Sequence, residues 1–193
     1  MTAEHIREHA LRHFAQKGYE GASLADISAE VGIKKQSIYN YFKGKDELFL
    51  AVFQDAAARE MLFVQDYLKR SSMLSLEHIL YGFIDEYRKR YEGEHDTKFF
   101  LRVAFFPPGH LEKDIMDYCN HHLDRMGELL VPVFESAVRK GELHSAVSVE
   151  QASIAFTAVL DSIFVELLYG GLERSLKRLD AAWYVYWRGV RNN

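Results

Sequence analysis

Residues 34–45 read Lys-Lys-Gln-Ser-Ile-Tyr-Asn-Tyr-Phe-Lys-Gly-Lys, a stretch that holds four lysines and no acidic residue. The chain of 193 residues has a formal net charge of -4, so this stretch is a local exception to an acidic average. Amide, hydroxyl and aromatic side chains lie between the lysines. A segment of this composition suits contact with a phosphate backbone and with base edges, because what DNA meets is the local charge.

The residues on the N-terminal side of this stretch predict a short helix and a tight turn. Ser23 is a suitable N-cap, with Asp26 three residues later as a variant of the capping box. Gly32 permits a left-handed turn. A second short helix, over about 35–41, would be anchored by the apolar Ile38. A helix, a glycine turn and a basic helix are the layout of a helix-turn-helix DNA reader.

Three segments together carry a resemblance to a known family. They are Phe-Ala-Gln-Lys-Gly-Tyr at 14–19, Ser-Leu-Ala-Asp-Ile at 23–27, and the run from Gly32 to Leu48. Over about residues 4–53, the sequence resembles the N-terminal domain of TetR-family transcriptional regulators. The resemblance implies a helix-turn-helix domain at 1–53 and a helical ligand-binding and dimerisation domain at 54–193.

The resemblance also implies which side chains contact DNA. The candidate DNA-binding residues are Ser23, Lys34, Lys35, Gln36, Ser37, Tyr39, Asn40, Tyr41 and Lys45. The Gln36 amide can bond an adenine edge in two places, whereas Ser37 and the tyrosine hydroxyls suit phosphate. Lys45 matches the lysine that grips the backbone. Ser23 can add a phosphate contact at a helix N-terminus.

Three positions of this region need separate comment. Phe42 is expected to be a buried wedge. Lys34 stands where the family often has a small capping residue, so the recognition helix is expected to be capped differently. Asn40 occupies a variable position and either reads a base or faces solvent.

Composition supports a fold of helices nearly throughout. Apolar residues make up 48% and charged residues 27% of the chain, as in ordinary globular proteins. With only three prolines and few β-branched runs, the chain predicts an all-α fold of about nine helices. A single cysteine, Cys119, excludes an internal disulfide and favours a reducing cytoplasm. Charge interrupts the longest apolar runs before the ~18 residues of a membrane span, so no membrane is expected as a partner.

The middle helices are rich in aromatic side chains, which suit an adaptable pocket for a small hydrophobic effector. The candidate ligand-binding residues are Phe83, Tyr87, Phe100, Val103, His122 and Met126. Any one of them can equally be plain core. Arg102, His122 and Glu166 are the polar groups that would reach such a pocket.

The last two helices are apolar on more than one side, which predicts two packing partners. Pairing them with a second copy of the chain would form a four-helix homodimer interface, as the resemblance also implies. The candidate interface residues are Phe156, Val159, Ile163, Leu167, Trp183 and Trp187.

The sequence contains no catalytic signature, and we expect no cofactor and no enzyme activity. His5, His9 and His13 share one face of the first helix, where a pair at i, i+4 could bind zinc. We expect a solvated histidine stripe instead, because no cysteine lies nearby. The chain is therefore expected to be a ligand-responsive repressor that binds a pseudo-palindromic DNA operator as a dimer. The alternatives are a helical enzyme or carrier, and a DNA binder without a small-molecule effector.

Overall fold

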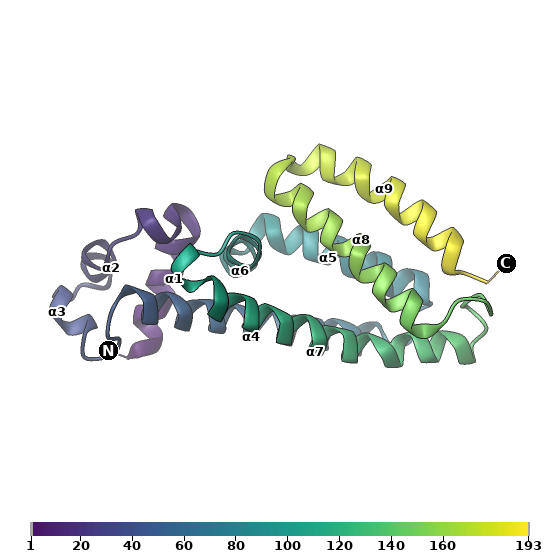
Figure 1. Cartoon of the computed structure of the whole chain (residues 1–193), viewed down its shortest axis with the longest axis horizontal. Helices are drawn as coiled ribbons and strands as arrows, with labels where there is room; N and C mark the ends of the chain where they lie inside the picture. Colours follow the sequence, from purple (N-terminus) through teal and green to yellow (C-terminus); the bar gives the residue numbers. More distant parts are fainter. Residues whose placement is uncertain (1, 193) are drawn as a thin grey trace. The chain divides into compact units, whose positions relative to one another are not determined.

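The computed structural model describes residues 2–192, apart from the side chain of Leu172. Over this range the chain forms nine α-helices, one short 3-10 helix and no strand, which confirms the all-α prediction (Figure 1). The helices are α1 (Ala3–Gly21), α2 (Leu24–Val31), α3 (Lys35–Ile38), α4 (Lys45–Ser71), α5 (Leu76–Gly93), α6 (His95–Phe105), η1 (Gly109–Leu111), α7 (Glu112–Arg139), α8 (Val149–Tyr169) and α9 (Gly171–Val190).

The chain divides into two compact units. The first comprises the residues up to Glu60 together with Gly93–Asn120, and the second comprises Met61–Glu92 and the residues from His121 onward. Helices α4 and α7 are continuous across the division and contribute residues to both units. These units do not coincide with segments 1–53 and 54–193, whose status as separate domains stays a prediction.

An aromatic cluster forms the core of the first unit. The Phe49 ring lies edge-on to Phe14 of α1 and Phe99 of α6, with centroids 4.9 and 5.4 Å away. In the same unit, Phe53 of α4 stacks on Phe100 of α6 at 5.7 Å. Edge-on and offset ring pairs of this kind add to the free energy of burial. Helices α1, α4 and α6 are therefore joined by side chains that are far apart in sequence.

The local start and stop signals near the N-terminus are confirmed. Gly18 has φ 69° and a non-helical backbone, so it interrupts α1. The Ser23 hydroxyl accepts a bond from the Asp26 N–H at 3.1 Å and caps α2. Gly32 ends α2 with φ 77° and ψ 31°, a left-handed conformation that glycine adopts without a Cβ clash.

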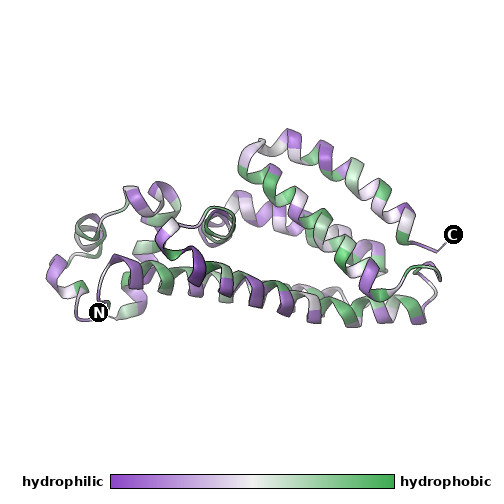
Figure 2. Ribbon diagram, viewed as in Figure 1, coloured by the Kyte–Doolittle hydropathy of each residue, from purple (hydrophilic) through white to green (hydrophobic). Residues whose placement is uncertain are grey.

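In the second unit, α8 packs along α9, and aromatic side chains of α5 and α8 form a cluster. The Phe83 ring contacts Tyr87 and Phe156 with centroids 5.2 and 6.2 Å away. Ser148 and Gln151 form a reciprocal capping box at the start of α8. Helix α8 is hydrophobic along much of its length (Figure 2).

Helix α8 is the one helix of residues 2–192 that is long and apolar enough to cross a membrane, although Asp161 and Glu166 interrupt its apolar run. Its 21 residues reach a mean hydropathy of 1.6 and meet the length and composition criteria of a membrane span. Of that apolar window, 44% is buried inside the chain. A helix that packs on one side and exposes apolar side chains on the other meets the same criteria, because composition does not record which side is covered.

Candidate nucleic-acid interface

The recognition helix α3 is a single turn that two buried apolar side chains anchor to the rest of the unit. It spans Lys35–Ile38 and is followed by turns, so it is shorter than the predicted 35–41. Ile38 is 0% exposed and Phe42 is 5% exposed, which confirms the anchor and the buried wedge. A four-residue helix is too short to be stable alone, so these buried contacts hold it in place.

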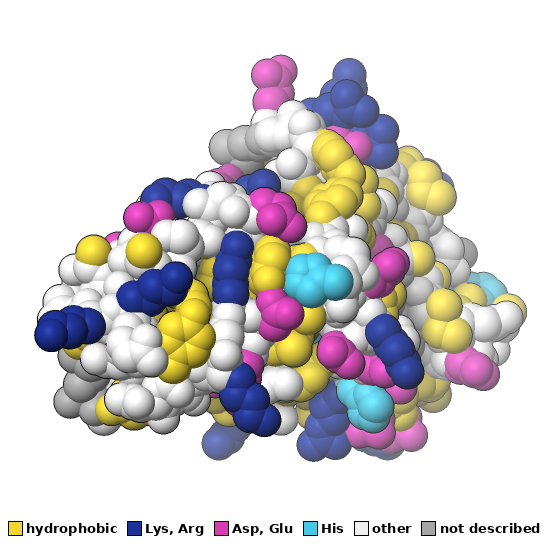
Figure 3. Space-filling model, turned by 60° about the vertical axis from the view of Figure 1, so that its left-hand side comes forward, with side chains coloured by type: hydrophobic (Ala, Val, Ile, Leu, Met, Phe, Trp, Pro, Cys, Tyr) yellow, Lys and Arg dark blue, Asp and Glu magenta, His cyan; other side chains and the backbone are white. Residues whose placement is uncertain are grey.

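The other candidate residues lie on the outer side of this turn. Tyr39 and Tyr41 are 43% and 41% exposed, large fractions for tyrosine. Further exposed or half-exposed candidates are Ser23, Lys34, Lys35, Gln36, Ser37 and Asn40. In the space-filling view, lysine and arginine side chains lie among uncharged and hydrophobic ones on the surface of this unit (Figure 3). Exposed cations, amides and hydroxyls in one short segment can contact both phosphates and base edges.

Lys34 occupies the N-cap position of α3 and departs from the usual capping chemistry, as expected. Its backbone is extended at φ -72° and ψ 140°, and no side-chain hydrogen bond caps the helix. Within α3, the Ser37 N–H donates to the Lys34 carbonyl at 2.8 Å.

Lys45 is positioned by a group of side chains that the sequence did not identify. Its Nζ lies 4.1 Å from the centre of the Tyr19 ring, a cation–π contact. The Tyr19 hydroxyl donates to the Asp46 carboxylate, and His110 Nε2 lies 3.5 Å from the same carboxylate. The His110 ring also lies edge-on to Tyr19 at 4.9 Å. The segment that joins α6 to α7 thus contacts the residues around Lys45.

These contacts perturb two ionisable groups. Burial, aided by the hydrogen bond to Asp46, raises the pKa of Tyr19 to about 12. The hydrogen bond from Tyr19 lowers the pKa of Asp46, and His110 and Lys45 add to the effect. Tyr19 therefore stays a neutral donor and Asp46 an anionic acceptor at neutral pH. No pattern in the sequence relates His110 to Lys45, because they lie 65 positions apart.

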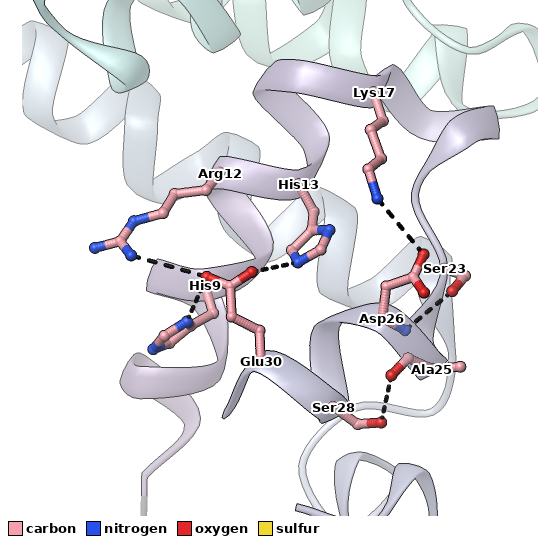
Figure 4. A network of polar contacts seen from close by, with 9 residues as sticks. All are labelled: His9, Arg12, His13, Lys17, Ser23, Ala25, Asp26, Ser28 and Glu30. Atoms are coloured by element: carbon pink, nitrogen blue, oxygen red, sulfur yellow. Dashed lines mark hydrogen bonds and ion pairs between the residues drawn. The ribbon is translucent and has the colours of Figure 1, made fainter. Parts of the chain in front are cut away.

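The histidine stripe is not solvated as expected, because Glu30 of α2 covers part of it. His9 Nδ1 and His13 Nε2 lie 3.0 and 2.6 Å from the two Glu30 oxygens (Figure 4). Arg12 Nη1 lies 3.8 Å from the same carboxylate. The hydrogen bond from His9 lowers the pKa of Glu30. This network joins α1 to α2, and the described residues contain no group of side chains that could hold a metal ion.

The candidate ligand-binding residues are all buried. Phe83, Tyr87, His122 and Met126 lie in the second unit, whereas Phe100 and Val103 lie in the first. A mostly apolar cavity of about 270 Å³ occurs elsewhere in the second unit, where α4 ends, α5 begins and α7 passes. Its lining residues are Leu68, Ser72, Leu74, Leu76, Ile79, Leu129, Pro132, Val133, Ser136, Ala137, Lys140 and Glu142. This lining includes none of the six candidates.

The three polar groups considered for a pocket have different surroundings. Arg102 is exposed. Glu166 is buried and pairs with Arg174 Nε at 2.8 Å and Arg178 Nη1 at 3.0 Å, which ties α8 to α9. Burial lowers the pKa of His122 to about 4.

Burial raises the pKa of the Cys119 thiol to about 11, so the thiol is protonated and unreactive at neutral pH.

Most of the candidate dimer residues lie within the core of the chain itself. Phe156, Ile163, Leu167 and Trp183 are buried, and Val159 and Trp187 are half-buried. Their side chains have little area left for a partner. The apolar side chains that α8 and α9 do expose are Ile154, Ala155, Ala158, Val165, Tyr169, Leu176, Ala181, Tyr184 and Val185. On α8 these exposed positions follow helical spacing and form one continuous face.

Comparison with known proteins agrees with this geometry. Residues 6–52 match the family model described as bacterial regulatory proteins, tetR family. The transcriptional repressor AcnR of Corynebacterium diphtheriae is 41% identical over 59 residues, which are 31% of each chain. The negative transcriptional regulator IcaR of Staphylococcus epidermidis is 28% identical over 130 residues, covering 65% of this chain and 63% of IcaR. The chain thus spans less than two thirds of either relative, and both are transcriptional regulators rather than enzymes.

Solved structures match the fold over nearly the whole chain. A TetR-family regulator from Mesorhizobium loti aligns with a TM-score of 0.77 at 18% identity, covering 98% of this chain and 96% of that one. The regulator FadR from Bacillus subtilis, solved with stearoyl-CoA, aligns with a TM-score of 0.72 at 16% identity, covering 97% and 99%. The N-terminal match and the exposed helix α3 lead to one conclusion: residues 6–52 are of the type found in bacterial regulatory proteins of the tetR family, and the fold of nearly the whole chain is similar to that of a solved TetR-family regulator.

Proposed function

We propose that the protein is a cytoplasmic transcriptional repressor that binds a pseudo-palindromic operator as a homodimer and is released by a small hydrophobic effector. The observation that carries the proposal is the α3 turn, whose polar side chains face outward from the buried Ile38. Its Gln36 amide would pair with an adenine edge in the major groove. Ser37, Tyr39 and Tyr41 would bond phosphates through their hydroxyls.

Lys45 and Ser23 would grip the backbone on either side of the recognition helix. The Lys45 ammonium rests on an aromatic ring and keeps its three donors for phosphate. The Ser23 hydroxyl accepts from the backbone of α2, so its own hydrogen can donate to phosphate at the helix N-terminus. Lys34, Lys35 and Asn40 would complete the contact surface.

A homodimer is supported by the exposed apolar face of α8, with Ile154, Val165 and Tyr169 among its residues. Such a face is unfavourable in water, and a second copy would cover it through a self-complementary contact. The interface we propose therefore uses the exposed side of α8, rather than the candidate side chains buried in the chain. Two recognition helices about 34–36 Å apart would then meet two successive major grooves.

An effector is supported by the cavity of about 270 Å³, close to the size of small-ligand pockets, with mostly apolar walls. That FadR of the same fold was solved with stearoyl-CoA supports an apolar effector class. One wall includes Leu68 of α4, and α4 begins at the proposed phosphate clamp Lys45. A ligand that favours another position of α4 would change the separation of the recognition helices, with a coupling of about 1–3 kcal/mol.

The proposal is tested by fluorescence anisotropy with duplex DNA from upstream of the protein's own gene. Affinity should fall steeply between about 50 and about 200 mM salt, because bound lysines release counterions. Lys45→Ala should weaken binding and reduce the slope of log K against log salt by about 0.9. Lys69→Ala, at the other end of α4, is the matched control and should leave both unchanged. DNA binding that ignores salt and Lys45→Ala alike would contradict the proposal.

A further inference from the structure

The second unit also contains an open groove of about 900 Å³ between α5 and α9. It is separate from the smaller apolar cavity, because the two share no lining residue. Its walls are Glu77, His78, Tyr81 and Gly82 of α5, and Asp180, Trp183, Tyr184, Trp187, Arg188 and Arg191 from α9 and its C-cap. Four aromatic rings thus line one groove, together with acidic and basic side chains.

The two indole rings in the groove present parallel faces. Trp183 and Trp187 lie one helical turn apart on α9, with ring planes 5° apart and centroids at 5.6 Å. Tyr81 of α5 meets Trp183 edge-on, with centroids 5.3 Å apart. Trp187 is only half-buried, and Tyr81 is 37% exposed. The geometry leaves ring surface open to solvent, which a flat ligand can cover by stacking.

Two carboxylates flank the contact between Tyr81 and Trp183. Asp180 precedes Trp183 by three residues on α9, and Glu77 precedes Tyr81 by four on α5, so each carboxylate lies on the same helix face as its ring. Neither carboxylate has an ion pair within residues 2–192. Each wall of the groove therefore places one negative charge beside this pair of rings.

The positive groups of the groove lie at the C-terminal end of α9. Arg188 is held by Tyr184, whose ring lies 5.3 Å from its guanidinium carbon and whose hydroxyl accepts from Nη1 at 2.5 Å. Arg191 follows the last turn of α9. Asp180 lies about two turns before Arg188, so the acidic and basic ends of the groove are distinct.

We propose that this groove binds a flat aromatic cation. Its ring stacks on the exposed part of the Trp187 indole, and its positive charge lies between Asp180 and Glu77, beside the exposed ring of Tyr81. Ring faces attract cations because their quadrupole is negative above the plane, and the two carboxylates add a direct attraction. This site does not depend on the proposed DNA-binding function, since none of the residues that line the groove belongs to the proposed DNA-binding surface.

The protein carries its own reporter for the test, because Trp183 and Trp187 are its two tryptophans. The full chain is titrated with 1-methylquinolinium while tryptophan emission is recorded, and calorimetry measures the stoichiometry. The expected result is saturable quenching with one cation per chain. Tetraethylammonium, which lacks a flat ring, and 1-methylnaphthalene, which lacks a charge, should each bind more weakly.

Charge-removing variants test the role of the carboxylates. Asp180→Asn and Glu77→Gln should each weaken 1-methylquinolinium binding about 2- to 5-fold, the range of exposed charge pairs. Glu173→Gln, on α9 outside the groove, is the matched control and should bind as the parent does. Unchanged thermal unfolding of each variant would show that the fold is intact.

Several results would overturn the proposal. Quenching that does not saturate, as for free N-acetyltryptophanamide, would mean collisions in solution rather than a site. Tighter binding of 1-naphthoate than of the cation would assign the groove to an anion. Tryptophan emission that changes with protein concentration and not with the cation would mean that a second copy of the chain fills the groove.

Discussion

Lys45 illustrates how much of a side chain's role depends on its neighbours. It begins α4, and the Tyr19 ring fixes its ammonium at 4.1 Å. Tyr19 is in turn held by Asp46, so the cation is placed by residues of both α1 and α4. Gln36 differs, because it is exposed and no hydrogen bond from the described residues holds its side chain. The proposed base contact is thus open to DNA, whereas the proposed phosphate clamp is preorganised.

Gln36→Ala should therefore change specificity rather than general DNA affinity. Loss of a bidentate amide contact should reduce binding to the operator by about 1–3 kcal/mol and relax the preference at one base pair. Competition binding with operators substituted at single positions measures this effect. Lys45→Ala serves for comparison and should weaken all sequences to a similar extent. A uniform loss for Gln36→Ala would assign Gln36 to the backbone.

His122 should make the stability of the protein depend on pH. Its pKa is lowered by burial from 6.5 to about 4, so the folded state disfavours the charged ring. Its stabilising contribution is complete above pH 6.5 and is lost as the pH falls toward 4, because only the unfolded state takes up the proton. Between pH 7 and pH 5 the loss should be about 2 kcal/mol. Urea unfolding measures it, and His122→Asn should lack this component; an equal pH dependence in both proteins would contradict the assignment.

The elements around the recognition helix depend on packing more than on helix propensity. Helix α3 has four residues and no side-chain cap, yet it is held by the buried Ile38 and by the glycine turn before it. Helix α2 is capped by Ser23 and tied to α1 through Glu30. The segment from α6 to α7 adds a further contact through His110 to the start of α4. The DNA-binding surface is thus supported by residues well outside the matched segment 6–52.

His110→Ala should lower DNA affinity without unfolding the protein. Asp46 would lose one of its partners and Tyr19 an edge contact, so Lys45 would be held less firmly. The expected loss is about 2- to 5-fold, since the contacts are partly exposed. Anisotropy measurements at one salt concentration test it. His95→Ala, an exposed histidine at the start of α6, is the control, and equal affinities for the two variants would exclude a positioning role for His110.

At the scale of the whole molecule, α8 has one covered side and one exposed apolar side. One side of it packs along α9 and the aromatic core, and Glu166 fixes that packing through two arginines. The other side exposes an apolar stripe that includes Ile154, 63% exposed. The same two-sided character explains why its composition resembles a membrane span. A homodimer would bury the stripe and bring two recognition helices together.

Ile154→Asp should shift the protein from dimer to monomer, because a buried unpaired carboxylate at the interface is strongly unfavourable. Sedimentation velocity measures the change, and operator affinity should fall with it, since one recognition helix then binds alone. Leu62→Asp replaces a comparably exposed leucine of α4, 59% exposed, and should remain dimeric. If Ile154→Asp stays dimeric, the α8 face is not the interface.

The sequence alone determined the features that depend on neighbouring residues. The cap at Ser23, the left-handed Gly32 and the buried Ile38 are confirmed. Each results from hydrogen bonds or apolar spacing within about four residues, so the local pattern contains the information. The family and the all-α fold followed from the same local pattern.

Only the tertiary structure decided which side of each helix is covered. It placed Glu30 against the histidine stripe, His110 beside Asp46, and Phe156 in the core rather than on an outer face. It also placed the cavities away from the six candidate ligand residues. Helical periodicity identifies an apolar side but not its partner, because the partner comes from a segment tens of residues away whose position depends on the packing of the whole core.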